Sequence, residues 1–104
     1  MVAWTDKIYY SENIKERKRA KIRKKIDSRR SPRDIFVIAS PTNPETLFDI
    51  LPAKELFKQF YEKDTVRIAG VAKGREEAEE LVREMVEEMY ANTGGFDSGN
   101  YFFL

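Results

Sequence analysis

The side chains that could do chemistry in this chain are limited by the absence of cysteine and histidine. Without cysteine there is no thiol nucleophile, disulfide or thiolate metal ligand, and without histidine the commonest metal ligand and the base of Ser-His catalysis are missing. Any reaction would depend on Asp, Glu, Lys, Arg, Ser or Tyr. The composition therefore favours a non-enzymatic protein, and it predicts neither a metal ion nor a cofactor.

A first group of candidate residues follows two apolar segments that are typical of strands, residues 35–39 and 65–72. If these strands are parallel, the turns after them meet at one edge of the sheet, where α/β proteins usually bind ligands. Hydroxyls, cations and helix N-termini at that edge would favour an anion such as phosphate or carboxylate. Alternatively, the same residue types only form caps and turns. The anion-binding candidates are Ser40, Thr42, Asn43, Lys73, Gly74 and Arg75.

A second group is a run of eleven cations between positions 15 and 33. Such a run could neutralise several phosphates of a nucleic acid with little sequence preference. No recognised nucleic-acid-binding motif accompanies it, and the alternative is a solvated helix or one that pairs with an acidic protein surface. The nucleic-acid-binding candidates are Arg17, Lys21, Arg23, Lys24, Lys25, Arg29 and Arg30.

Charge is unevenly distributed along the chain, although the formal net charge is only +1. Residues 1–34 contain 12 Lys/Arg against 5 Asp/Glu, whereas residues 75–104 contain 2 against 8. The acidic end places glutamates four residues apart, which aligns them on one side of a helix. Exposed glutamates without a cavity are poor cation ligands, so this pattern predicts a solvated face and not a metal site.

The elements that would position these groups form a single predicted α/β domain over residues 1–104. Its core is a right-handed βαβα unit with a small parallel sheet, in which a helix over residues 44–61 connects the two strands and a turn follows at Lys63–Asp64. Asn43 would cap that helix, and Ser11 would cap the basic helix. The predicted parts are an N-terminal arm (1–12), a basic helix (13–28), the βαβα core (33–93) and an apolar C-terminal tail (94–104).

The last helix has the clearest pattern, because apolar residues recur from Ala78 to Tyr90 at helical spacing and Gly94 follows as a stop. Aromatic residues at both chain ends are candidates for an interface with a second copy or with another protein. These interface candidates are Trp4, Tyr101, Phe102 and Phe103. Since two strands make a poor sheet, we expect the arm or a homodimer to complete it.

Three stretches, residues 43–52, 67–74 and 92–97, resemble small uncharacterised bacterial α/β proteins. The resemblance spans about residues 34–97, leaves out the basic helix and implies no activity. The N-terminal residues lack the features of a secretory signal, and no apolar run is long enough to span a membrane, so we expect a cytoplasmic protein. The sequence favours an interaction or regulatory protein, with nucleic-acid binding and anion binding or catalysis as alternatives.

Overall fold

Four strands form a mixed β-sheet within residues 2–58 and 65–103, the part of the chain that this computed structural model describes. They are β1 (Val2–Tyr10), β2 (Ile35–Ala39), β3 (Asp49–Pro52) and β4 (Val66–Lys73), in the spatial order β1-β4-β2-β3. β1 runs parallel to β4, while β2 is antiparallel to both β4 and β3. The predicted α/β class is confirmed, but the sheet is mixed and not parallel.

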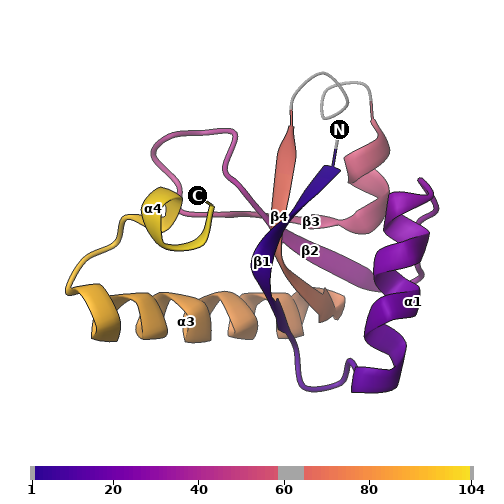
Figure 1. Cartoon of the computed structure of the whole chain (residues 1–104), viewed down its shortest axis with the longest axis horizontal. Helices are drawn as coiled ribbons and strands as arrows, with labels where there is room; N and C mark the ends of the chain where they lie inside the picture. The colour runs from indigo at the N-terminus through magenta and orange to yellow at the C-terminus, as the bar shows by residue number, and fades with distance from the viewer. Residues whose placement is uncertain (1, 59–64, 104) are drawn as a thin grey trace.

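Helices cover both faces of the sheet, so the described chain has three layers (Figure 1). On one face lie α1 (Glu16–Asp27) and the short 3-10 helix η1 (Ala53–Phe57); on the other lie α3 (Gly74–Thr93) and α4 (Ser98–Phe102). Each face has its own apolar core. Ile26 and Leu56 belong to the first core, and Met85 and Met89 belong to the second.

β2 and β4 occupy the middle of the sheet because their apolar runs are buried on both faces. A continuous run of this kind is expected for a strand that is covered on both sides. β1 is an edge strand with an irregular course. Between the pairs Trp4–Ile68 and Tyr9–Gly70, β1 has four residues where β4 has one. This bulge, residues 5–8, moves Thr5, Asp6 and Lys7 out of the regular ladder, while Ile8 packs against the first core.

α3 forms as predicted, since its buried residues Ala78, Leu81, Met85 and Met89 follow helical spacing and face the sheet. The helix ends where Gly94 adopts a left-handed conformation (φ 73°) and its N–H donates to the carbonyl of Tyr90. The predicted glycine stop is therefore confirmed.

The predicted helix over residues 44–61 is wrong. Residues 49–52 instead form β3, which pairs with β2, and among the described residues of this span only 53–57 are helical. Asn43 caps no helix; its side-chain oxygen accepts from the N–H of Glu45 in a turn. The right-handed parallel crossover is also wrong, because β2 and β4 are antiparallel. Phe60 and Tyr61 of that helix, and the turn at Lys63–Asp64, lie outside the described residues.

The N-terminal arm is a strand, and Ser11 after it does not cap the basic helix. α1 begins at Glu16 with Lys15 as its N-cap residue, and no side chain caps it. Ser11 is buried and connects β1 to the start of α3 instead. Its hydroxyl donates to Glu77 (2.7 Å) and accepts from the N–H of Lys73 (3.0 Å).

Candidate functional site

A groove lined by cations runs between α1 and the segment that leads into β2. Its cavity has a volume of about 320 Å³, and we call it the basic groove. Isoleucines and a proline supply its apolar lining, and no carboxylate contributes to it. The lining residues with charge are Lys15, Lys18, Lys21, Lys25, Arg33 and Lys73.

The helical repeat of α1 explains why these lysines gather on one side. Positions 15, 18, 22 and 25 are three or four residues apart and therefore share one flank of the helix. At position 22 an isoleucine contributes to the apolar lining, while Ile26 is fully buried against the sheet. Long lysine stems can cover such apolar surface while their ammonium groups reach water. Ile22 and Ile26 thus pack α1 against the sheet, and this orientation places Lys18, Lys21 and Lys25 beside the groove.

In the part of the chain that the structure describes, Lys73 of the basic groove interacts electrostatically with Glu77, at the start of α3. No ion pair there joins any of its six cations to a carboxylate. α1 and the glutamate-rich α3 lie on opposite faces of the sheet, although Glu77 at the start of α3 accepts from the side-chain amide of Asn13, just before α1 (Figure 1). Among the described residues, no ion pair joins α1 to the acidic face of α3.

The other flank of α1 packs on aromatic residues of β1. The guanidinium of Arg19 lies 4.4 Å from the centre of the Tyr10 ring, and that of Arg23 lies 4.8 Å from the Trp4 ring. The indole N–H of Trp4 also donates to Asp27 (2.7 Å). Arginine over an aromatic face is a favourable cation–π arrangement. Arg19 and Arg23 therefore help to hold the helix, whereas Lys18, Lys21 and Lys25 line the groove.

The predicted nucleic-acid-binding residues are divided between these environments. Lys21 and Lys25 line the basic groove, Arg23 stacks on β1, and Arg29 lies over the ring of Phe57. The other three candidates are exposed: Arg17, Lys24 and Arg30. Three groove cations belong to the predicted cationic run but were not singled out as nucleic-acid-binding residues, namely Lys15, Lys18 and Arg33. Lys73 was assigned to the anion site.

The predicted anion site at the ends of two strands is not assembled. Because β2 and β4 are antiparallel, their carboxyl ends lie at opposite ends of the sheet. Ser40 instead lies beside the start of β4, where its hydroxyl accepts from the N–H of Arg67, whereas Lys73 pairs with Ile35. Thr42 and Asn43 follow Ser40, while Gly74 and Arg75 follow Lys73, so the six candidates form two separate groups.

The predicted interface aromatics are used within the chain. Trp4 packs against the first core, and Phe102 is buried in the second, with Tyr101 and Phe103 packed partly buried around it. Phe48 contacts both Phe102 and Phe103 in tilted or edge-on ring pairs. The tail therefore covers its own sheet face, while Trp4, Tyr101 and Phe103 remain partly exposed.

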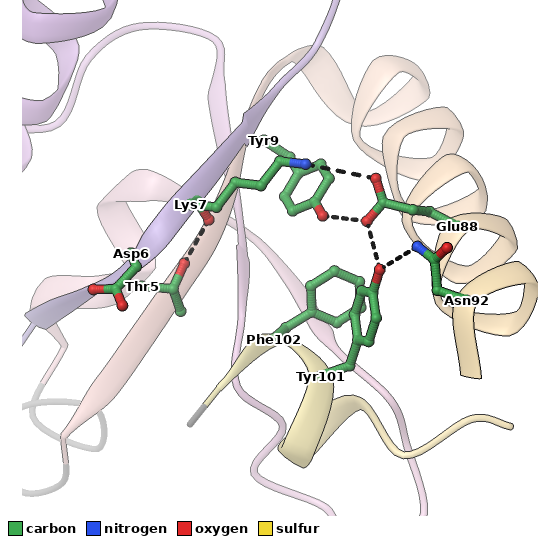
Figure 2. A pocket seen from close by; sticks show the side chains of 8 residues that line it. All are labelled: Thr5, Asp6, Lys7, Tyr9, Glu88, Asn92, Tyr101 and Phe102. Atoms are coloured by element: carbon green, nitrogen blue, oxygen red, sulfur yellow. Dashed lines mark hydrogen bonds and ion pairs between the residues drawn. The ribbon is translucent and has the colours of Figure 1, made fainter.

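A second pocket, which the sequence pattern did not reveal, lies where the bulge of β1 faces α3 and α4 (Figure 2). Its volume is about 430 Å³, and we call it the tyrosine pocket. The hydroxyls of Tyr9 and Tyr101 both donate to Oε2 of Glu88, and the side-chain amide of Asn92 donates to the Tyr101 hydroxyl (2.7 Å). Lys7 approaches the other carboxylate oxygen, Oε1, at 3.6 Å. The remaining lining residues are Thr5, Asp6 and Phe102.

These contacts determine the charge states in the tyrosine pocket. The hydrogen bond from Tyr9 holds the pKa of Glu88 below its usual range, with further contributions from Tyr101 and Lys7 that outweigh the effect of burial. Burial, followed by the hydrogen bond to Glu88, raises the pKa of Tyr9 well above its usual value. Glu88 is therefore a carboxylate and Tyr9 a neutral donor at neutral pH. Because Tyr9 and Glu88 are 79 residues apart, sequence spacing carried no signal of this cluster.

The described residues contain no cluster of three or more acidic side chains that could hold a metal ion. Nor is any helix in residues 2–58 or 65–103 long and apolar enough to cross a membrane. Comparisons with protein-family models, curated proteins and solved structures found no match to this chain.

Proposed function

We propose that this protein binds nucleic acid through the sugar-phosphate backbone, with the basic groove as its contact surface. One observation carries the proposal: six cations surround one cavity that has no carboxylate in its lining. Lysine ammonium groups bind phosphates as point charges and impose little sequence preference. The protein would act as a non-enzymatic binding protein, and its affinity would come mainly from the release of counterions.

Two further features support a polymer of phosphates over an acidic protein surface. The apolar lining of the groove allows lysine stems to pack while their charges turn outward, which suits a flexible charged backbone. On the opposite flank of α1, Trp4 and Tyr10 are only partly buried beneath their arginines, so aromatic faces lie close to the cationic surface. Aromatic and cationic groups side by side are typical of single-strand binding.

The test is the salt dependence of binding to labelled random-sequence DNA duplex and single-stranded RNA, followed by fluorescence anisotropy. Full use of the groove predicts a slope of log K against log salt of up to about −5 for duplex and about −4 for single strands. The double variant Lys21→Ala/Lys25→Ala should reduce the duplex slope by about 2 and weaken binding at every salt concentration. The matched control Arg75→Ala/Arg83→Ala removes the same charge from α3 and should leave the slope unchanged.

Two outcomes would overturn the proposal. One is an absence of binding to either nucleic acid at low salt. The other is binding whose slope falls equally in the groove variant and in the α3 control, because that result would assign the affinity to overall charge and not to the groove. Circular dichroism of both variants should match that of the native protein, since all four side chains are exposed or lie at the rim of a pocket.

A further inference from the structure

The bulge of β1 aims a lysine into the tyrosine pocket. A regular strand would alternate its side chains between the two faces of the sheet, but residues 5–8 leave the ladder opposite Ala69 of β4. The hydroxyl of Thr5 fixes this excursion by donating to the carbonyl of Lys7 (2.8 Å). As a result the Lys7 ammonium lies 4.6 Å from the centre of the Tyr9 ring and close to Glu88 (Figure 2).

The carboxylate of Glu88 is only half satisfied by the protein. Its Oε2 accepts from two tyrosine hydroxyls, whereas among the described residues its Oε1 faces only Lys7. The 3.6 Å between Oε1 and the Lys7 nitrogen exceeds the 2.7–2.9 Å of a good charge-assisted hydrogen bond. The Lys7 side chain is also 70% exposed, so little holds it in place.

The walls of the pocket suit a cation that carries a short apolar chain. Phe102 and Tyr101 make an edge-on ring pair at 4.7 Å, and Tyr9 contacts Phe102 edge-on at 5.6 Å. In Figure 2 Tyr101 and Phe102 lie on the side of the pocket away from Lys7, whereas Tyr9 lies beside Lys7, and Asp6 points away from the cluster. Aromatic faces beside one carboxylate are a favourable environment for an ammonium group.

We propose that the tyrosine pocket binds a primary alkylammonium group, which displaces Lys7 and donates to Oε1 of Glu88 over the Tyr9 ring. In the absence of a ligand, the ammonium group of Lys7 occupies the position that the ligand's ammonium group would take. A primary ammonium is the expected class because three N–H donors can satisfy the open acceptor, which a quaternary ammonium cannot do. This site is separate from the basic groove, which lies on the opposite face of the sheet, and it does not depend on nucleic-acid binding.

The experiment is a titration of n-butylammonium chloride into the isotope-labelled protein, followed by amide chemical shifts in NMR spectra. The variant Lys7→Ala removes the protein's own ammonium group from the pocket. Because exposed ion pairs contribute up to about 1 kcal/mol, we expect up to about fivefold tighter binding than in the native protein. Saturable shifts should be confined to β1, α4 and the last two turns of α3. The matched control Lys54→Ala removes an exposed lysine elsewhere and should bind as the native protein does.

Two independent experiments test whether binding requires the negative charge of Glu88 and the positive charge of the ligand. Glu88→Gln should abolish the saturable shifts, and n-butanol, a neutral analogue of the probe, should produce none in Lys7→Ala even if Glu88→Gln fails to fold. Tetramethylammonium should bind more weakly than n-butylammonium, because it cannot donate to Oε1. Equal shifts from n-butylammonium and n-butanol, or no saturable shifts in Lys7→Ala, would overturn the proposal.

The ammonium could come from a free amine or from a lysine of another protein. Both sources share the chemistry of the probe, and a blocked lysine, Nα-acetyl-lysine methylamide, separates them. Tighter binding of the blocked lysine than of n-butylammonium identifies a protein lysine as the ligand. Weaker binding identifies a free amine, since the peptide groups then only obstruct the pocket.

Discussion

Replacing Ser11 by alanine should destabilise the protein more than any exposed serine substitution. Ser11 is only 6% exposed, and its backbone N–H donates to the carbonyl of Val71 at 3.0 Å. Its hydroxyl adds two further bonds, to the Glu77 carboxylate and from the N–H of Lys73. These contacts connect the end of β1 to the junction between β4 and α3. Alanine keeps the backbone bond but deletes both hydroxyl bonds.

The expected loss is about 2 kcal/mol of unfolding free energy. A buried neutral hydrogen bond contributes about 1 kcal/mol, and one to a charged group about 1.5–3 kcal/mol. The Lys73 N–H would also lose the Ser11 hydroxyl as an acceptor, which adds a desolvation cost. Against this, Glu77 keeps the side-chain amide of Asn13 at 2.6 Å, so its carboxylate stays partly satisfied.

Urea denaturation of the native protein and of Ser11→Ala measures this loss, with the slope m expected to be unchanged. The control is Ser31→Ala, an exposed serine that should alter stability by less than about 0.5 kcal/mol. If Ser11→Ala is as stable as the control, the hydroxyl contacts do not hold β1 to α3 and the reasoning is refuted.

The same pair of proteins should show a pH dependence. Burial raises the pKa of Glu77, but the hydrogen bonds from Asn13 and Ser11 and the charge of Lys73 outweigh it and hold the pKa below its usual range. A lowered pKa stabilises the fold above the unfolded-state value, and the stabilisation is lost as the pH falls through the folded-state value. The difference between native protein and Ser11→Ala should therefore shrink below about pH 4. A constant difference would contradict this assignment.

Three other substitutions test the packing and the tyrosine pocket. Gly70→Ala places a Cβ 3.1 Å from the Cδ1 of Ile38 and should lower the unfolding free energy by about 1–3 kcal/mol in urea denaturation. Adding Ile38→Val, which removes that Cδ1, should recover part of this stability. Burial and Glu88 raise the pKa of Tyr9, so the stability that Tyr9 gives the fold is complete below about pH 10 and is lost as the pH rises above that value. Tyr9→Phe should therefore reduce the decrease in melting temperature at alkaline pH. Trp4→Phe deletes the indole bond to the end of α1 and should cost about 1 kcal/mol by thermal circular dichroism, and an unchanged melting temperature would contradict it.

Local pattern predicted the elements whose burial is regular. The run from Ile35 to Ala39 coincides with β2, and the helical repeat from Ala78 to Tyr90 lies within α3. Each pattern shows which side chains of one element are buried, and in these two elements no alternative secondary structure fits the pattern. Gly94 ends α3 for an equally local reason, since its left-handed conformation suits glycine.

Strand direction and partner choice could not be predicted from the same patterns. Leu47, Phe48, Ile50 and Leu51 match a helical repeat, but Ile50 and Leu51 also fit a short strand, and pairing with β2 decides the outcome. A buried apolar run reads the same in both directions, so the antiparallel arrangement of β2 and β4 left no local signal. In its described residues, the long connection between β2 and β4 contains β3, which forms an antiparallel pair with β2, and η1.

The candidate site was predictable only in part. The run of cations pointed to Lys21 and Lys25 as binding residues. It could not show that they line the groove while Arg23 packs on Trp4, because this depends on which flank of α1 meets β1. That choice is made by tertiary packing. Lys73, at the end of β4, lines the basic groove, and Glu88 lines the tyrosine pocket although the sequence pattern placed it on a solvated face. Both positions depend on residues that are distant in sequence and become neighbours only in the folded sheet.

The position of β4 has a consequence for how this chain acquires its fold during synthesis. β4 pairs with β1 and with β2, and its partners in β1 precede it by more than 60 residues. The N-terminal strand therefore leaves the ribosome without a pairing partner, accompanied by the cationic segment that follows it. Long-range pairing of this kind raises contact order, so we expect folding on the order of milliseconds to seconds, delayed until β4 has emerged.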